Sequence, residues 1–270
     1  MAISRLTSKD NPLLKRIRLI ASGSRRAPSG FAVAEGMRVL AELDPDTFRI
    51  EAVLASESFG ASGKENALLQ RWLANDVRIC KVDENLFRSV SDVRAPQGAI
   101  ALVRFPERTL DAVEPGRNAL VLFACGIRDP GNLGTVIRAA TAAGASFVCT
   151  GKETVSARNP KAIRASAGAV FRIPIVESIG TVDFLAYCRR HSIRAYRTDV
   201  IEGSPHTRVD LSAPCAIVLG NEGSGVPQHE WSALPAIRIP MAAGVESLNV
   251  AIAGAVILFE ALRQRMSNSP

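Results

Sequence analysis

Three segments in the C-terminal half of the chain combine asparagine, glycine and other polar residues at the ends of apolar runs. They cover residues 129–138, 219–225 and 239–251. Each apolar run is typical of a strand, and the stretch that follows is typical of a loop or a helix start. Such strand–helix junctions are where α/β proteins build ligand sites. Three of them in one half of the chain predict a single shared binding or active site.

The second segment is rich in glycine, with Gly220, Gly223 and Gly225 directly after a strongly apolar run. Glycine allows a ligand to approach the backbone closely and allows positive φ. No Gly-Lys-Ser/Thr follows, as a phosphate-binding loop requires, and the GxGxxG pattern of dinucleotide sites is missing. Glu222 is acidic where a phosphate would need positive charge. The segment therefore favours a nucleoside or a positively charged ligand, with an ordinary glycine-rich turn as the alternative.

Polar residues in the other two segments are candidates for the same site. If Asn132 begins a helix, Arg138 is offset from it by roughly 120° around the axis, yet a capping Asn132 could still face the same cavity. A capping asparagine with a solvated arginine is the alternative. Ser247 is expected to cap the last helix. Asn249, a poor helix former without a capping role, must find partners at the mouth of an apolar helix.

The elements that must position these residues form two α/β domains. Residues 1–105 are expected to form a small first domain, 106–117 a linker that carries Pro106, Pro115 and Gly116 with mixed charges, and 118–270 a second domain with cleaner strands. Strands that alternate with helices predict a parallel sheet with helices on both faces. In the second domain we expect strands at 119–124, 146–150, 193–196, 215–220 and 236–240, and helices at 132–143, 160–167, 182–191 and 247–266.

The charge of the chain favours a polyanionic partner. Lysine and arginine number 33 against 26 acidic residues, a net charge of +7, and much of the excess lies in residues 1–30. A helix capped by Ser8 would turn its basic residues away from its apolar stripe. A solvated helix face is the alternative to nucleic-acid contact. The expected RNA-binding side chains are Lys15, Arg16, Arg18, Arg25 and Arg26.

Cysteine and histidine usage indicates neither disulfides nor a metal site. The five cysteines are odd in number, widely spaced and free of CxxC pairs, which is typical of buried thiols in a reducing compartment. The three histidines show no metal-ligand spacing with them. The N-terminus lacks an apolar signal core, and no apolar run could span a bilayer. We therefore expect a cytoplasmic protein without metal or membrane contact.

The three segments, in this order, resemble motifs 1, 2 and 3 of the SpoU (TrmH-like) RNA 2′-O-ribose methyltransferases. The similarity covers residues 119–265. Residues 4–103 resemble, more weakly, the small L30e-like substrate-binding domain that precedes the motifs in ribosomal RNA members. The resemblance implies a SPOUT trefoil knot in the second domain, although knots are rare among folds. It also implies a homodimer built on that domain and S-adenosylmethionine as cofactor.

The resemblance also implies residue roles. The expected cofactor contacts are Leu219, Gly220, Glu222, Ile239, Met241 and Leu248. The expected catalytic residues are Arg138, Asn132, Glu222, Ser247 and Asn249. Because a guanidinium is essentially always protonated, Arg138 is expected to stabilise a developing alkoxide or bind a neighbouring phosphate, with the others positioning it and the ribose hydroxyl. Cys125 departs from the family, since many members carry an acidic residue there, which puts the local hydrogen bonding in question.

The expected function is S-adenosylmethionine-dependent methylation of a ribose 2′-hydroxyl in RNA. Ribosomal RNA is favoured because the first domain resembles that of ribosomal RNA members, and transfer RNA is the near alternative. A non-catalytic RNA-binding protein of the same fold is disfavoured by the intact motif residues. A Rossmann enzyme that does not act on RNA is disfavoured by the missing GxGxxG.

Overall fold

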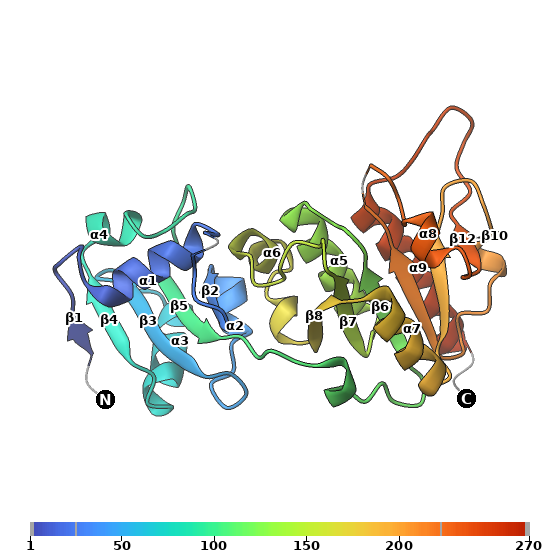
Figure 1. Cartoon of the computed structure of the whole chain (residues 1–270). Coiled ribbons are helices and arrows are strands. Elements are labelled where there is room, and N and C mark those ends of the chain that lie inside the picture. The colour runs from blue at the N-terminus through green and yellow to red at the C-terminus, as the bar shows by residue number, and fades with distance from the viewer. Residues whose placement is uncertain (1–2, 25, 222, 268–270) are drawn as a thin grey trace. The chain divides into compact units, whose positions relative to one another are not determined.

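The computed structural model describes residues 3–24, 26–221 and 223–267, and the chain forms two compact units (Figure 1). The N-terminal unit comprises Met1–Pro106 and Arg158–Phe171, and the C-terminal unit comprises Glu107–Ala157 and Arg172–Pro270. The segment Arg158–Phe171 was expected in the second domain. It groups with the N-terminal unit because its helix packs against strand β2 and Phe171 contacts Phe48, with ring centroids 5.3 Å apart.

The N-terminal unit contains a five-stranded mixed sheet in the order β1-β4-β3-β5-β2. Its strands are β1 (Ser4–Arg5), β2 (Phe31–Glu35), β3 (Ile50–Ser56), β4 (Ile79–Val82) and β5 (Ala99–Arg104). Strand β5 pairs antiparallel with both of its neighbours, whereas the other pairs are parallel. Its helices are α1 (Pro12–Ala21), α2 (Met37–Ala41), α3 (Gly63–Ala74), α4 (Glu84–Arg88) and α6 (Pro160–Ala165).

Helix α1 begins later than the sequence suggested. The expected cap, Ser8, lies in the turn before the helix, where its hydroxyl accepts a hydrogen bond from the Asp10 amide. Asn11 is the N-cap, and its side chain accepts from the Leu13 amide at 2.9 Å. Pro12 then occupies the first turn, where a missing N–H costs nothing. The helix therefore starts at the proline instead of continuing through it.

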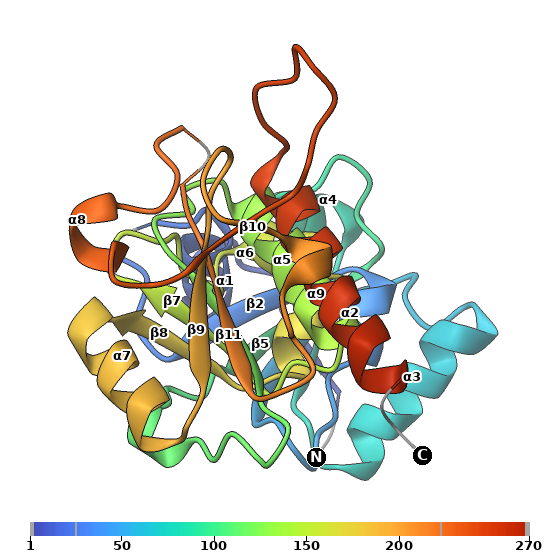
Figure 2. The same cartoon turned by 90° about the vertical axis from the view of Figure 1, so that its right-hand side faces the viewer.

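The C-terminal unit contains a seven-stranded sheet in the order β10-β12-β9-β11-β6-β7-β8, and every strand pair is parallel. Its strands are β6 (Leu120–Ala124), β7 (Phe147–Gly151), β8 (Ile175–Ile179), β9 (Arg194–Thr198), β10 (Ser204–Pro205), β11 (Cys215–Leu219) and β12 (Ala236–Arg238). Its helices are α5 (Pro130–Ala142), α7 (Thr181–Arg190), α8 (Gln228–Trp231) and α9 (Val250–Ser267). Helices α7 and α8 cover one face and α5 and α9 the other (Figure 2). The expected parallel sheet with helices on both faces is confirmed.

The face under α7 and α8 is closed by an aromatic cluster. The ring of Phe123 on β6 lies 4.5 Å from that of Phe184 on α7 and 4.9 Å from that of Trp231 on α8, measured between centroids. All three side chains are buried. This packing holds β6 against α7 and α8 on one face of the sheet.

On the other face, α9 lies directly against β11 and α5 because residue 254 is glycine. A Cβ atom added at Gly254 would lie 2.5 Å from Cδ1 of Leu219 and 2.7 Å from Cγ2 of Val136. Carbon atoms that are not bonded to each other essentially never come this close, so with a larger residue the helix or the two side chains would have to shift. The close approach places the start of α9 beside the end of β11.

The far end of α9 is tied to the sheet by Arg265. Its guanidinium donates to the backbone carbonyls of Leu211, Ala213 and Ala119, each at 3.0 Å. Hydrogen bonds from a charged group are stronger than those between neutral groups. With Gly254 at one point and Arg265 at another, α9 has a fixed position along the sheet.

Replacing Gly254 with alanine is expected to lower the free energy of unfolding of the C-terminal unit by about 1–3 kcal/mol, because overpacking of a close contact costs that much. This destabilisation is opposite in sign to the usual effect of the substitution, since alanine in place of glycine inside a helix normally stabilises the helix by up to about 1 kcal/mol. Gly63→Ala in α3 is the matched control, because nothing lies within 4 Å of its added Cβ. Urea denaturation measures both variants, and a Gly254→Ala protein as stable as the wild type would contradict the close contact.

Candidate functional site

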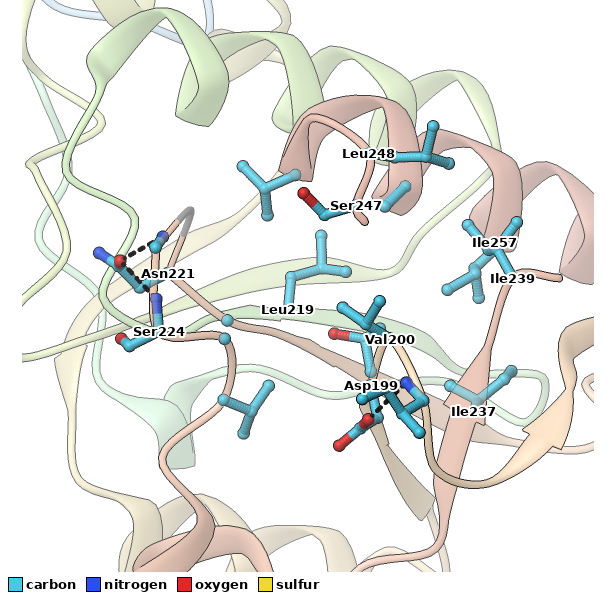
Figure 3. Close-up of a pocket in the computed structure, with 18 of the residues that line it drawn as sticks. Asp199, Val200, Leu219, Asn221, Ser224, Ile237, Ile239, Ser247, Leu248 and Ile257 are labelled. Atoms are coloured by element: carbon cyan, nitrogen blue, oxygen red, sulfur yellow. Dashed lines mark hydrogen bonds between the residues drawn. The ribbon is translucent and has the colours of Figure 1, made fainter. Parts of the chain in front are cut away.

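A cavity of about 350 Å³ opens at the carboxyl ends of β9, β11 and β12 (Figure 3). The described residues of its wall are 198–201 at the end of β9, 219–221 and 223–226 at the end of β11, and parts of the chain from β12 into α9. In a parallel sheet these strand ends share one edge, which is where α/β proteins bind ligands. The expected residues that line the cavity are Leu219, Gly220, Ile239, Met241, Ser247 and Leu248. Glu222 lies outside the described residues.

The glycine-rich segment folds back on itself beside the cavity. Asn221 and Gly225 exchange two backbone hydrogen bonds, of 2.9 and 3.0 Å. A Cβ atom at Gly220 would lie 2.1 Å from the carbonyl carbon of Gly225 and 2.2 Å from the amide nitrogen of Val226. Residue 220 must therefore be glycine because the chain touches its own backbone there.

The side chain of Asn221 holds this fold in place and was not among the expected site residues. Its amide nitrogen donates to the carbonyl of Gly126 at 2.7 Å, and its oxygen accepts from the amides of Gly223 and Ser224 at 2.8 and 3.3 Å (Figure 3). The amide of Gly126 in turn donates to the hydroxyl of Thr154. One half-buried asparagine thus joins the loops that follow β11, β6 and β7.

Two of the expected asparagines are bonded to each other. The side-chain nitrogen of Asn249 donates to the side-chain oxygen of Asn132 at 2.9 Å. Asn249 is also the cap of α9, since its oxygen accepts from the amides of Ala251 and Ile252 at 3.0 and 3.3 Å. The expectation that Ser247 caps this helix is wrong, because the helix begins one residue after Asn249. Ser247 lies in the cavity wall instead.

Asn132 and Arg138 lie on α5, but neither caps it. Asp129 is the N-cap, and its carboxylate accepts from the amide of Asn132 at 2.9 Å, so Asn132 belongs to the first turn. Arg138 is exposed farther along the helix, and its guanidinium pairs with none of the described residues. The structure therefore joins Asn132 to Asn249, and it leaves Arg138 in solvent and outside the cavity wall.

The family of the chain follows from its sequence together with this fold. Residues 119–259 match the SpoU rRNA Methylase family, and residues 11–101 match the MRM3-like substrate binding domain. The chain belongs to the SpoU rRNA Methylase family. The resemblance inferred from the three motif segments is confirmed, and so is the fold class of an α/β trefoil-knot methyltransferase domain preceded by a small substrate-binding domain.

Individual members of the SpoU family are similar over most of the chain. The 23S rRNA (guanosine(2553)-2′-O)-methyltransferase RlmP of Bacillus subtilis is 31% identical over 79% of this chain and 88% of its own length. An AdoMet-bound rRNA methyltransferase from Sinorhizobium meliloti is 28% identical, with a TM-score of 0.85 over 97% of this chain and 98% of that one. The SpoU methyltransferase AviRb from Streptomyces viridochromogenes is 26% identical, with a TM-score of 0.83 over 95% and 98% of the two chains.

The basic side chains expected to contact RNA lie in the substrate-binding unit of this SpoU protein. Lys15 pairs with Asp10 at 3.0 Å, and both groups are exposed. Arg18 donates to the backbone and the hydroxyl of Ser89, each at 3.3 Å. These contacts are at the surface, where an ion pair or hydrogen bond contributes little to the free energy of folding. Lys15 and Arg18 can therefore give up these partners for an RNA phosphate at little cost.

Arg16 is more firmly held. Its guanidinium carbon lies 3.7 Å from the centre of the Phe31 ring, and that of Arg104 lies 5.0 Å from the same ring. The Nε atom of Arg104 also donates to the Glu51 carboxylate at 2.9 Å. Both guanidinium groups still have further N–H donors for another partner, because contact with the face of an aromatic ring does not use them. Arg26 is exposed, and Arg25 lies outside the described residues.

Cys125, which departs from the family pattern, has a structural position at the end of β6. Its amide donates to the carbonyl of Leu219 at 2.8 Å, which joins β6 to the cavity wall. Burial raises the pKa of its thiol to about 11. The thiol therefore stays protonated at physiological pH, which excludes the thiolate chemistry of reactive cysteines.

Neither a metal centre nor a membrane span is present in the described part of the chain. Across residues 3–24, 26–221 and 223–267, no three side chains of histidine, cysteine, aspartate or glutamate come together as metal ligands. Over the same ranges, none of the helices has the length and apolar character needed to cross a bilayer.

Replacing Asn221 with alanine is expected to lower the free energy of unfolding by about 2–3 kcal/mol, since three hydrogen bonds to backbone groups are lost, one of them to the half-buried Gly126. It should also weaken binding of S-adenosylmethionine, because the cavity wall loses its tie to Gly126. Urea denaturation and calorimetric titration measure the two effects. Asn118→Ala is the matched control, an exposed asparagine of the same unit whose side chain makes no hydrogen bond with a described residue. Cofactor affinity equal to the wild type in Asn221→Ala would contradict this role.

Proposed function

We propose that this protein transfers a methyl group from S-adenosylmethionine to a ribose 2′-hydroxyl of ribosomal RNA in the cytoplasm. The observation that carries the proposal is the meeting of the SpoU motif segments at one edge of the parallel sheet. The cavity wall includes residues 219–221 and 223–226 of the second segment and residues 239, 241, 247, 248 and 250 of the third. Asn249 of the third segment bonds to Asn132 of the first. Relatives named as 23S rRNA 2′-O-methyltransferases, such as RlmP of Bacillus subtilis, support ribosomal RNA as the substrate.

The cavity fits a nucleoside that carries positive charge. A phosphate would require lysine or arginine, and neither is among the described residues of the wall. Its one charged side chain there is Asp199, whose carboxylate is paired with Arg197, so the wall accepts a cationic nucleoside without offering it a free carboxylate. The remaining wall is largely apolar, as is usual for small-molecule sites. S-adenosylmethionine supplies an electrophilic methyl group on its sulfonium sulfur. The residues that would hold it are Leu219, Gly220, Ile239, Met241 and Leu248, together with Glu222, which lies outside the described residues.

The protein itself must orient the ribose hydroxyl and help its proton leave, and orientation supplies much of the rate. A guanidinium is a poor base, so the role of Arg138 is to stabilise the alkoxide that develops or to bind the adjacent phosphate. Its guanidinium is exposed and pairs with none of the described residues, which leaves it available to RNA. The Asn132–Asn249 pair and Ser247 position the hydroxyl between α5 and the cavity.

The N-terminal unit is proposed to bind the RNA through its basic side chains. Arg16 and Arg104 present donors around the Phe31 ring, and Lys15, Arg18 and Arg26 lie on the same unit. Arginine and lysine contacts to phosphates supply affinity without sequence preference. The match of residues 11–101 to a substrate-binding domain supports this division of labour.

A homodimer through the C-terminal unit is also proposed. Helix α9 exposes apolar side chains on one stripe, with Ile252 54%, Val256 36% and Phe259 47% exposed. They recur at intervals of four and three residues, so they share one face of the helix. An exposed apolar stripe of this kind marks a protein interface, and a second copy of the same helix is its self-complementary partner.

Arg138→Ala is expected to lower methyl transfer by about 100- to 1000-fold, as loss of a group that stabilises developing charge does. Cofactor affinity should stay unchanged, because Arg138 is outside the cavity wall. The test starts from cells in which the gene is deleted and supplies them with the wild-type gene, the Arg138→Ala variant or the exposed control Arg189→Ala. The 2′-O-methyl groups in their ribosomal RNA are then mapped. Restoration by Arg138→Ala would refute its role, and an rRNA methylation pattern that does not depend on the gene would refute the substrate.

Phe259→Asp is expected to convert the dimer to a monomer, because it places a charge within the apolar stripe. Light scattering at micromolar concentration measures the mass. Val182→Asp is the control, since Val182 is 77% exposed on α7, away from α9. A monomeric wild type, or a Phe259→Asp protein that remains dimeric, would show that this stripe is not the interface.

A further inference from the structure

One wall of the cavity is held from outside the cavity by a buried arginine. Arg197, the penultimate residue of β9, is 5% exposed, and its guanidinium forms ion pairs with the carboxylates of Asp199 and Glu202. Consecutive strand residues point to opposite faces of a sheet. Within β9, Thr198 lines the cavity whereas Arg197 does not, so the Arg197 side chain points to the other face of the sheet. Asp199 follows the end of the strand, where its carboxylate meets the Arg197 guanidinium.

Asp199 is tied through both of its oxygens. One pairs with Arg197, and the other accepts from the amides of Ile201 and Glu202, each at 2.9 Å. Burial works to raise the pKa of Asp199, but the hydrogen bonds from these two amides and the Arg197 guanidinium outweigh it and hold the pKa below its usual value. The carboxylate is therefore charged at neutral pH, and it closes residues 199–202 into a compact turn.

This turn presents apolar side chains to the cavity. Val200 and Ile201 are 47% and 84% exposed although both belong to the wall. In Figure 3, Asp199 and Val200 lie on the side of the cavity opposite Ser247 and Leu248. The amides of Ile201 and Glu202 are already bonded to Asp199, so the turn offers a ligand its apolar surface. Its shape depends on the Asp199 carboxylate and hence on Arg197.

The stability of the fold does not by itself explain why Arg197 is placed between Asp199 and Glu202. A buried ion pair adds little over well-packed apolar residues, because both charges lose their hydration. Arg197 also has a buried Nε atom without a hydrogen-bond partner in the described chain, which is a further cost. An apolar residue would satisfy a purely structural requirement at position 197 better than an arginine does.

We propose that Arg197 is a positioning residue for the cofactor site, which acts through Asp199 and Glu202 to hold Val200 and Ile201 as the apolar wall of the cavity. The proposal rests on the proposed function, in that the cavity is taken to bind S-adenosylmethionine. Arg197 touches none of the reacting groups, so its loss should weaken cofactor binding and leave the methyl-transfer step almost unchanged.

The test compares Arg197→Met, Arg197→Lys and the control Arg194→Met, an exposed arginine at the start of the same strand. Calorimetry gives the Kd of S-adenosylhomocysteine, and assays on ribosomal RNA give KM for S-adenosylmethionine and kcat. Arg197→Met should raise Kd and KM about tenfold and change kcat by less than about threefold, the signature of lost ground-state binding. Arg197→Lys should lie between, because one ammonium replaces a guanidinium that spans two carboxylates. Arg194→Met should match the wild type.

A folded Arg197→Met protein with the Kd of the wild type would overturn the proposal, as would a fall in kcat at unchanged KM. If that variant does not fold, Glu202→Gln replaces it, since the Glu202 side chain is 56% exposed and tolerates substitution. It should raise the Kd by about two- to threefold, and no change in Kd would overturn the proposal. A wild-type protein that binds neither S-adenosylmethionine nor S-adenosylhomocysteine would refute the proposed function itself.

Discussion

At Gly220 the chain passes so close to the backbone of Gly225 and Val226 that no side chain fits between them. This contact turns the end of β11 into a closed loop, and Asn221 bonds that loop to Gly126 beyond the neighbouring strand β6. Because β11 lies between β9 and β6, the loop stands in the middle of the sheet edge, with the other cavity segments around it. Residues of this loop line the cavity together with the segments that follow β9 and β12. If the loop opened, the cavity would therefore lose the part of its wall that this loop forms.

Apolar runs predicted the central strands well and the peripheral structure poorly. The expected strands 119–124 and 215–220 agree with β6 and β11 to within one residue, because buried parallel strands are apolar without interruption. Strand β8 was missed, since its second half is polar and Ser178 adopts a positive φ of 62°. Strand β10 is two residues long and carries no periodicity at all. The cap of α9 was misplaced because Ser247 and Asn249 are both residue types that can cap a helix. Which of them does so depends on where the backbone becomes helical, and the sequence does not show this.

The parts of the site that sequence could supply are those carried by motif segments. Asn132, Ser247 and Asn249 could be singled out by residue type and position, whereas the importance of Asn221 comes from a bond to Gly126, 95 residues away. Arg197 has no local signal either, because an arginine in a short strand is typically exposed. Only the fold shows that two carboxylates converge on it. Such long-range polar contacts depend on tertiary structure, and a single sequence does not encode them in its periodicity.

The bond between Asn132 and Asn249 has an electrostatic consequence. Asn132 lies in the first turn of α5 and Asn249 caps α9, so the bond brings the N-termini of two helices together. Each N-terminus carries a partial positive charge from its aligned peptide dipoles, and these fields add where the termini meet. At α5 the Asp129 carboxylate already caps the helix and offsets part of this field. A ribose oxygen that loses its proton there, or a phosphate beside it, would therefore meet the full field of α9 and the reduced field of α5.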